Sequence, residues 1–375
     1  MKVIFSTNLP SPYRVDFFNE LGKHCDLTVL YERKVSAERN SKWRGVDAQN
    51  FKEIYLDLTE WGVDLAKGPA LKNYIKEHKS DILIFTNYSS PATREAIIWC
   101  RLHGRKYYME YDGGFNKKDS LIKRMVKKFL LKGATGHLTT AEEHIKYLMS
   151  LGIHRDTIYK YPFTSVTQTD LTNAYTALAK GREYYRKKLG ITEKHMILTV
   201  GRFSNGGAYI KGYDVLMRIA KIIGPDVGIY IVGDRPTEEY TEMKVTQSLN
   251  NVHFVGFKSK RELINYYIAA DLFILLTRGD VWGLVINESM SYALPIITTN
   301  RCIAGLELVE QGVNGYLVDY RDLTSIINSI HAILDDSDRK SSFGKHSLEK
   351  IKKYTISEMC KRHIEIFDLL ISDGK

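Results

Sequence analysis

The most informative part of this chain runs from Asp280 to Pro295 and reads Asp-Val-Trp-Gly-Leu-Val-Ile-Asn-Glu-Ser-Met-Ser-Tyr-Ala-Leu-Pro. A glycine turn at Gly283 leads into a short amphipathic segment that is typical of a helix. This helix must stop before Pro295, because proline lacks an amide hydrogen and clashes with the preceding turn. Residues 296–299, Ile-Ile-Thr-Thr, have the composition of a buried strand. The stretch therefore predicts a helix followed at once by a strand.

The start of this predicted helix has the chemistry of a phosphate site. A helix N-terminus leaves backbone amides without internal partners, and its dipole favours negative charge. The amides near Gly283, Leu284 and Val285 are therefore candidates to hold a phosphate. Asp280 and Glu288 flank them with carboxylates that are suited to accept hydrogen bonds from hydroxyl groups. Phosphate combined with a polyhydroxyl group describes a sugar nucleotide.

A second candidate segment lies earlier in the chain, where the strand-like run 197–200 ends in Gly201. Arg202 follows this glycine, and Lys211 stands just before the next predicted helix. Arginine presents a rigid fork to phosphate oxygens, whereas lysine supplies a compact point charge. Together the two cations are suited to neutralise a diphosphate and to stabilise it as it departs.

Several motifs occur in an order that resembles the family-four group of retaining glycosyltransferases, the glycosyl transferases group 1. They are Gly-Arg-Phe at 201–203, Lys-Gly-Tyr-Asp at 211–214, Val-His-Phe-Val-Gly-Phe-Lys at 252–258, Ala-Asp-Leu-Phe-Ile at 270–274, the acids Asp280 and Glu288 before Ser-Met-Ser-Tyr-Ala-Leu-Pro, and Gly-Val-Asn-Gly-Tyr-Leu-Val at 312–318. The family usually has glutamate at the first acid position. Asp280 is shorter by one methylene, so we expect a changed contact to the donor sugar or a different sugar.

The resemblance implies the GT-B fold, an α/β architecture with two Rossmann-like, doubly wound domains facing a central cleft. Its last helix crosses back onto the first domain. The resemblance also implies a nucleotide-diphosphate sugar as donor, with uridine the commonest base, and retention of the anomeric configuration. A saccharide or lipid-linked saccharide is the expected acceptor, in bacterial polysaccharide or cell-envelope biosynthesis such as capsule or exopolysaccharide assembly.

Site roles follow from family position. Glu288 is expected to contact the ribose, and Phe257 and Lys258 the base. Asp280 is expected to hold hydroxyl groups of the donor sugar, and Gly201 belongs to the same donor-binding set. The predicted catalytic residues are Arg202, Lys211, Asp280 and Asp112.

Strand-like and helix-like segments alternate along the first half of the chain, which predicts a parallel sheet covered on both faces. The expected strands are 3–6, 27–31, 54–56, 82–86 and 106–110, and the expected helices are 13–21, 65–78, 92–102 and 121–131. We predict a first domain over 1–165, completed by a C-terminal helix at about 354–375. A polar stretch over 166–181 is expected to be an irregular linker. The second domain is expected over 182–353.

The loop after the first strand excludes one class of nucleotide-binding enzyme. It reads Asn-Leu-Pro-Ser-Pro-Tyr-Arg over 8–14 and has none of the glycines of a dinucleotide-binding loop, which argues against an NAD-dependent enzyme. Its prolines resemble those of a subset acting in bacterial surface-polysaccharide assembly. Tyr13 or Arg14 is a candidate to line the acceptor side. For Tyr13 the alternative is a residue in a proline-rich turn that leads into a helix.

The third candidate site is Glu110-Tyr-Asp-Gly-Gly, which ends at Gly114. Two acids at the end of a strand, followed by paired glycines, place carboxylates on backbone that can approach a ligand closely. Many relatives have a histidine near this point, whereas this chain has acids. Asp112 is therefore the candidate for a sugar-hydroxyl or acceptor contact. The alternative is that Asp112 shapes the turn with its own side chain.

Basic charge is concentrated in one part of the chain. The formal net charge is +10, and the segment from Arg101 to Lys132 contains ten basic and three acidic residues. Within residues 117–132 apolar positions recur at helical spacing, and cations occupy most of the others. Such a helix suits an anionic membrane surface. The alternative is an ordinary helix whose apolar stripe packs in the core.

Composition places the protein in a broad class. A chain of 375 residues with 44% hydrophobic content suits two domains with proper cores. The four cysteines are widely spaced, which favours reduced thiols over a disulfide framework or a zinc site. We find neither a signal-peptide pattern nor an apolar run long enough to span a membrane. The expected location is the cytoplasm, either free or attached peripherally to the inner face of the plasma membrane.

We predict no required metal or cofactor, because Arg202, Lys211 and helix amides can supply the positive charge that a divalent ion supplies elsewhere. Asp336-Ser-Asp338 has the form of a metal-binding motif but lies in a polar turn. Two alternatives to the transferase are a sugar-nucleotide epimerase of the same fold and a non-catalytic sugar-nucleotide-binding protein. A nucleic-acid partner is not expected, since the basic charge lies on one amphipathic segment and no nucleic-acid motif occurs.

Overall fold

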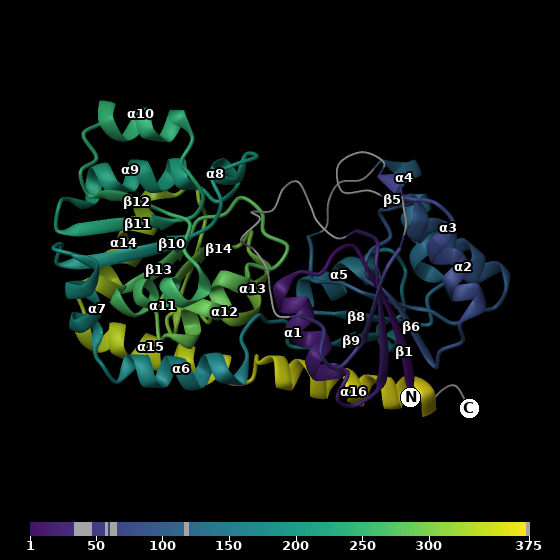
Figure 1. Cartoon of the computed structure of the whole chain (residues 1–375). Helices are drawn as coiled ribbons and strands as arrows, with labels where there is room; N and C mark the ends of the chain where they lie inside the picture. The colour runs from purple at the N-terminus through teal and green to yellow at the C-terminus, as the bar shows by residue number, and fades with distance from the viewer. Residues whose placement is uncertain (34–46, 57–58, 61–65, 116–119, 373–375) are drawn as a thin grey trace. The chain divides into compact units, whose positions relative to one another are not determined.

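The computed structural model describes residues 1–33, 47–56, 59–60, 66–115 and 120–372. The chain forms two compact units (Figure 1). The first unit comprises residues 1–165 together with 355–375, and the second comprises residues 166–354.

The first unit is built on a seven-stranded parallel sheet in the order β3-β2-β1-β6-β7-β8-β9. Its strands are β1 (Lys2–Thr7), β2 (Asp26–Tyr31), β3 (Lys52–Tyr55), β6 (Ile82–Phe85), β7 (Tyr108–Glu110), β8 (Gly136–Thr139) and β9 (Ile158–Lys160). A small antiparallel pair, β4 (Thr59–Glu60) and β5 (Ala66–Lys67), stands apart. The central strand β1 is buried from Val3 onward, as expected for a parallel strand covered on both faces.

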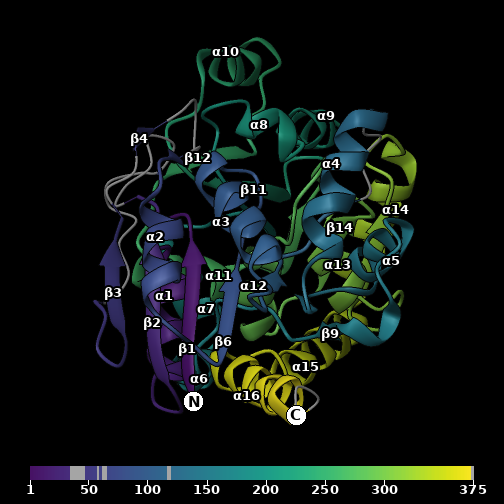
Figure 2. The same ribbon diagram turned by 90° about the vertical axis from the view of Figure 1, so that its right-hand side faces the viewer.

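Helices cover this sheet, and one of them comes from the far end of the chain. They are α1 (Pro12–Leu21), α2 (Ala70–Glu77), α3 (Pro91–Leu102), α4 (Leu121–Lys132), α5 (Glu142–Ser150), the short 3₁₀ helix η1 (Arg155–Thr157) and α16 (Ile356–Ser372). The helix α16, yellow in Figure 2, packs against α1. Its His363 lies on Phe17 of α1, with ring centroids 4.7 Å apart, and its Phe367 reaches Phe5 of β1. The last helix therefore completes the core of the first unit.

The second unit contains a six-stranded parallel sheet in the order β12-β11-β10-β13-β14-β15. The strands are β10 (His195–Val200), β11 (Val227–Val232), β12 (Val252–Gly256), β13 (Leu272–Leu275), β14 (Ile296–Thr299) and β15 (Gly315–Val318). The helices are α6 (Gln168–Leu178), α7 (Arg182–Leu189), α8 (Gly207–Ile210), α9 (Tyr213–Ile223), α10 (Glu238–Thr246), α11 (Lys260–Ala269), α12 (Leu284–Ser291), α13 (Ile303–Leu308), α14 (Leu323–Leu334) and α15 (Ser337–Ile351). Both units thus have the Rossmann-like α/β architecture that the sequence predicts.

Two predicted elements need correction. The stretch 166–181 is not an irregular linker, because it contains α6, whose start is fixed by a capping box between Thr167 and Asp170. The helix expected over 65–78 begins only at Ala70, after Pro69 at the N-cap, and Leu65 lies outside the described residues. Proline is favoured at a helix start and is poorly tolerated in its interior, so the later start is physically reasonable.

Candidate functional site

The candidate donor site of the second unit lies at the carboxyl edge of its sheet, where ligands of such sheets usually bind. Gly201 follows β10, and its amide donates a hydrogen bond to the Val232 carbonyl (2.9 Å). A Cβ atom at Gly201 would lie 2.8 Å from the Tyr213 hydroxyl and 3.2 Å from Cγ of Lys211. Only glycine fits this position without displacing a neighbour, which explains why the strand ends in this residue.

Lys211 and Asp280, which are 69 residues apart in the sequence, form an ion pair between Nζ and Oδ2. Their side chains remain 20% and 18% exposed, so the pair is accessible from solvent. The Asp280 amide donates to the Arg301 carbonyl (2.9 Å), which fixes the backbone of the acid. The structure therefore brings together two groups that the sequence assigns to the same donor.

The start of α12 lies directly beside this pair. Gly283 adopts a φ of +102° as the N-cap residue, and no side chain caps the helix. A Cβ atom at Gly283 would lie 2.6 Å from Sγ of Cys302 and 3.7 Å from Oδ2 of Asp280. The first-turn amides of Leu284 and Val285 have no partner within an α-helix. The helix start thus offers an anion-binding terminus next to Lys211.

Arg278, which the sequence analysis missed, ties the two halves of this site together. Its guanidinium makes two hydrogen bonds of 2.7 Å to the carboxylate of Asp214 and lies 3.9 Å from the ring centroid of Tyr209. Its amide also donates to the Ile210 carbonyl (2.7 Å). Hydrogen bonding to Asp214 raises the pKa of Arg278 above its usual value. Arg278 stands two residues before Asp280, and this closeness to a predicted site residue is the signal in the sequence by which it could have been found.

Arg202 lies immediately after Gly201 and is half-buried. A Cβ atom at Gly207 would lie 2.6 Å from Cγ of Arg202, so the arginine packs against the start of α8. Asp234, also missed in the sequence, follows β11 and accepts hydrogen bonds from the amides of Phe203 and Ser204. Burial would raise the pKa of Asp234, but these hydrogen bonds lower it below its usual value. Asp234 thereby holds the loop that carries Arg202.

The other predicted donor residues lie on α12 and directly after β12 of the same unit. Glu288 lies farther along α12, and its Oε2 accepts a hydrogen bond from the Tyr267 hydroxyl (3.0 Å). Burial and the Glu288 charge raise the pKa of Tyr267 well above its usual value, so the hydroxyl remains a donor. Phe257 and Lys258 follow β12, which is two strands from β10 in the sheet. Their assignment to the base, and that of Glu288 to the ribose, stay predictions.

The first unit has a separate polar cluster around Arg14. The guanidinium forms ion pairs with Glu110 and Asp112, and the Tyr13 hydroxyl donates to Oδ2 of Asp112 (3.1 Å). Glu110 is fully buried, and its Oε2 also lies 3.3 Å from Nε2 of His363. Burial alone would raise the pKa of Glu110, but Arg14 and His363 lower it from 4.5 to about 2. In this cluster, buried charged groups of the first unit are stabilised by partners of opposite charge.

Asp112 is thus already engaged by Arg14 and Tyr13, although its side chain remains 32% exposed. The paired glycines that follow it, Gly113 and Gly114, have φ values of +123° and +138°, which favour glycine. These contacts favour a role for Asp112 in fixing the turn. Its contact with a sugar hydroxyl or an acceptor stays a prediction.

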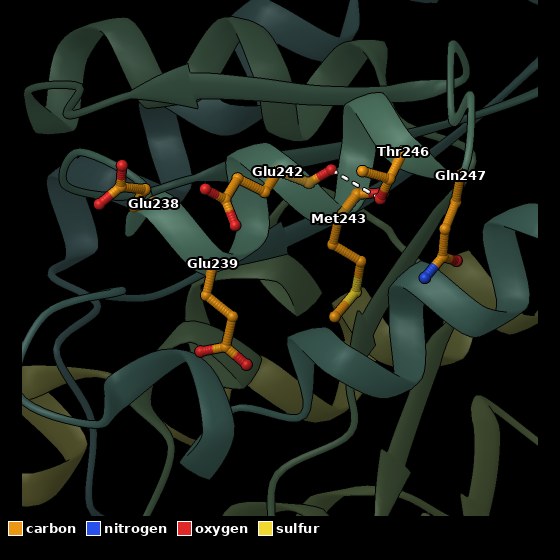
Figure 3. A pocket seen from close by; sticks show the side chains of 6 residues that line it. All are labelled: Glu238, Glu239, Glu242, Met243, Thr246 and Gln247. Atoms are coloured by element: carbon orange, nitrogen blue, oxygen red, sulfur yellow. Dashed lines mark hydrogen bonds between the residues drawn. The ribbon is translucent and has the colours of Figure 1, made fainter.

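Other candidate sites carry less chemistry. In the described parts of the chain, no group of three or more His, Cys, Asp or Glu side chains is arranged to hold a metal ion. Asp336 caps α15, since its Oδ1 accepts the Arg339 amide (2.9 Å). A shallow pocket lies along α10 and Gln247, between three glutamates and Met243 (Figure 3). None of its residues belongs to the donor site described above.

Residues 181–350 match the family model described as Glycosyl transferases group 1. This match covers most of the second unit. The family resemblance inferred from the sequence motifs is therefore confirmed. None of the helices among the described residues combines the length and apolar character needed to cross a bilayer.

Proteins that are similar to this chain in sequence have varied names. An uncharacterized 41.2 kDa protein in the cps region of Klebsiella pneumoniae is 29% identical over 181 residues, which are 47% of this chain and 46% of that protein. The N-acetyl-alpha-D-glucosaminyl L-malate synthase of Bacillus anthracis is 28% identical over 193 residues, covering 50% and 49% of the two chains. An uncharacterized glycosyltransferase of Haemophilus influenzae is 23% identical over 271 residues, covering 71% and 70%. The chain thus spans about half the length of the first two relatives.

Solved structures of low sequence identity share the whole fold. A glycosyltransferase from Rickettsia africae has a TM-score of 0.77 at 15% identity, covering 99% of this chain and 98% of its own. The HepE protein of Anabaena, solved with UDP, has a TM-score of 0.73 at 17% identity, covering 98% and 100%. WaaG, described as a glycosyltransferase involved in lipopolysaccharide biosynthesis, has a TM-score of 0.67 at 14% identity, covering 97% and 99%. These likenesses confirm the predicted GT-B fold.

Proposed function

We propose that this protein transfers a sugar from a nucleotide-diphosphate sugar, with uridine as the base, to a hydroxyl group of a saccharide or lipid-linked saccharide. The anomeric configuration is retained, and the reaction belongs to bacterial polysaccharide or cell-envelope biosynthesis. The observation that carries the proposal is the juxtaposition of Lys211, Asp280 and the uncapped start of α12. The group 1 family match supports the reaction type.

In this proposal the diphosphate of the donor lies between Lys211 and the amides of Leu284 and Val285. Arg202 supplies a second cation from the end of β10. These groups are held in place by backbone and by the Arg278 bridge, so little reorganisation is needed when negative charge develops on the leaving diphosphate. The bond between the anomeric carbon and the diphosphate oxygen breaks, and the acceptor oxygen bonds to that carbon while its hydroxyl proton is released.

The Lys211–Asp280 ion pair changes partners when the donor binds in this proposal. In the donor-free protein Asp280 neutralises Lys211. A diphosphate carries more negative charge than one carboxylate, so it competes for the ammonium group and releases Asp280. The freed carboxylate is then available to accept hydrogen bonds from hydroxyl groups of the donor sugar. The shorter aspartate is suited to this exchange because it already reaches Lys211.

One protein of the same fold supports the choice of donor class. The Anabaena HepE protein has been solved with UDP, with UDP and glucose, and with UDP-glucose. These ligands belong to that protein, and its low identity to this chain shows the fold alone. We extend the nucleotide-sugar donor to this chain as part of the proposal, because the phosphate-binding features described above are present in its own residues.

The test is thermal stabilisation of the purified protein across a panel of nucleotide-diphosphate sugars without added metal. A donor present at one hundred times its dissociation constant stabilises the protein by about 2.7 kcal/mol. We expect one donor to raise the melting temperature, and Glu288→Ala to lose the shift. Glu349→Ala, which removes an exposed carboxylate of the same unit paired with Lys352, is the control and keeps the shift.

Two results would contradict the proposal. No stabilisation by any nucleotide sugar, together with no nucleotide release in the presence of saccharide acceptors, would reject the donor site. Release of an isomerised sugar without any acceptor would instead identify an epimerase of the same fold.

A further inference from the structure

The helix α4 presents its apolar side to solvent. Its exposed apolar side chains are Leu121 (81%), Ile122 (76%), Met125 (69%), Val126 (45%) and Phe129 (51%). Only Leu130 and Leu131 of this helix are buried. In the first unit α4 lies beside α3 (Figure 1). The interpretation in which the apolar stripe packs in the core is therefore wrong.

Cations of α4 point toward the protein instead. Nη2 of Arg124 donates to the Ser150 carbonyl (2.7 Å), and Nζ of Lys127 donates to the Tyr147 hydroxyl (3.1 Å). Both partners belong to α5, so two charged side chains occupy the packed face of the helix. A surface helix of a globular protein ordinarily has the opposite arrangement, with its apolar face packed and its charges in water. An apolar face exposed in this way is expected to bind a partner.

The remaining lysines border the exposed apolar face. At about 100° per residue, the five apolar positions occupy an arc of roughly 140° around the helix axis. Lys128 and Lys132 lie along one edge of this arc, and Lys123 lies beyond the other edge. Lys123 and Lys132 are exposed, Lys128 is half-buried, and residues 121–132 contain no acidic residue. The face therefore combines apolar contact area with positive charge on both sides.

Arg101 of α3 contacts α4 at Phe129, near the C-terminal end of the helix. Its guanidinium donates to the Phe129 carbonyl and lies 4.2 Å from the centroid of the Phe129 ring. The phenyl ring is thus held in place at the surface although half of it is exposed. A preformed apolar face loses less conformational entropy when it binds than a flexible one does.

We propose that α4 docks on an anionic lipid bilayer, with its five apolar side chains at the boundary of the acyl chains and Lys123, Lys128 and Lys132 among the headgroups. Charge decides between this occupant and another protein surface. Apolar residues bordered by lysines suit an interface that is apolar in depth and negative at its surface. The protein is accordingly a peripheral membrane protein, independently of which donor it uses.

The experiment is flotation of the full-length protein with two kinds of vesicle. One is phosphatidylcholine alone, and the other contains about one third phosphatidylglycerol, which gives the negative surface that attracts lysines. We expect binding to the anionic vesicles, and at least tenfold weaker binding when phosphatidylglycerol is omitted or the salt concentration is raised. The double variant Met125→Gln/Phe129→Gln is expected to lose binding by a similar factor. Lys128→Glu/Lys132→Glu is expected to weaken it at least tenfold.

Matched controls keep the result specific to α4. Val245→Gln changes an exposed apolar residue of α10, and Lys187→Glu/Lys221→Glu makes the same change in net charge on α7 and α9. Both controls are expected to bind vesicles as the parent protein does. Equal melting temperatures of all variants exclude unfolding as the cause.

Three outcomes would overturn the proposal. The first is no binding to either vesicle, and the second is binding that the α4 variants leave unchanged. The third is a dimer in sedimentation equilibrium that Met125→Gln/Phe129→Gln dissociates, which would make α4 a contact between two copies of this chain. The vesicle assay contains neither donor nor acceptor, so its failure leaves the transfer reaction untouched.

Discussion

At the scale of single residues, the cluster of Arg14 and Glu110 shows how a buried charge depends on its partners. Glu110 is fully buried, yet Arg14 and His363 lower its pKa from 4.5 to about 2. A depressed carboxyl pKa contributes stability that is present above the unfolded-state pKa and is lost as the pH falls through the folded-state value. The relevant window is therefore about pH 4.5 to 2, and the contribution is on the order of 3 kcal/mol.

We predict that the first unit loses stability as the pH falls from about 5 toward 3, and that Glu110→Gln removes this part of the pH dependence. At neutral pH the variant leaves Arg14 with one carboxylate fewer, so it destabilises the unit by about 3 kcal/mol or more. Thermal melts between pH 7 and pH 3 measure both effects. Glu142→Gln, which removes a partner of an exposed 3.4 Å pair with Lys160, is the control and changes stability by less than about 1 kcal/mol. An equal effect of both variants would contradict the role of the buried pair.

A second prediction at this scale concerns Arg278. Arg278→Lys loses the two-pronged contact to Asp214, because lysine has no planar fork. We expect the affinity for the donor nucleotide to fall about tenfold while the melting temperature changes little, since Lys211 is no longer held in place. The control is Arg321→Lys, which changes an exposed arginine paired with Asp319 in the same unit. Calorimetric titration with UDP distinguishes them, and equal affinities would show that the bridge does not position the site.

At the scale of elements, a glycine allows the loop that carries Lys211 to approach the end of β13 closely. Gly212 has a φ of +73°, and a Cβ atom there would lie 2.1 Å from the Leu276 carbonyl oxygen. Gly190 has nearly the same backbone conformation, with a φ of +68°, but a Cβ atom there would meet nothing within 4 Å. The pair therefore separates the cost of backbone strain from the cost of a clash.

We predict that Gly190→Ala costs about 1 kcal/mol of stability, the ordinary penalty of a left-handed conformation. Gly212→Ala costs more than this, because the loop that carries Lys211 must also move away from Leu276. Donor-induced stabilisation is expected to disappear in Gly212→Ala and to persist in Gly190→Ala. Thermal melts with and without donor measure both quantities. If the two variants behaved alike, crowding at Gly212 would play no part in the site.

Elements also show how far the sequence alone could lead. The start of α12 was predictable because Gly283, the helix pattern and Pro295 are local signals, and all act within one short stretch. α6 was missed because its polar composition suggested a loop, although the spacing of Thr167 and Asp170 is that of a capping box. For α4 the sequence gives amphipathicity only. Which face packs depends on contacts with α5, so exposure of the apolar side needed the structure.

At the scale of the whole molecule, the two sheets were predictable from alternating strands and helices, whereas the pairing of distant residues was not. Lys211 and Asp280 were separate candidates in the sequence, and only the fold shows that they form one ion pair. The engagement of Asp112 by Arg14 was equally out of reach, because the partners are 98 residues apart. Local signals reveal which residues are suited to a ligand. Long-range contacts decide which of them are accessible together.

A prediction at this scale follows from the division into two units. The second unit has its own sheet and its own core, and the proposed donor residues all lie within it. Residues 166–354 expressed alone are therefore expected to fold and to bind UDP with the affinity of the full chain, within about threefold. Circular dichroism and calorimetric titration measure the two properties. A folded fragment that does not bind UDP would show that the donor site needs residues of the first unit.

The most direct measurement is the dissociation constant of UDP for the full-length protein and for Lys211→Met, determined by calorimetric titration without metal. Lys221→Met, which removes an exposed lysine of α9, is the matched control. Loss of a charge-assisted hydrogen bond to phosphate is expected to weaken binding at least tenfold in Lys211→Met, with no change in Lys221→Met. Equal affinity of all three proteins for UDP would contradict the assignment of Lys211 and the start of α12 to the donor diphosphate.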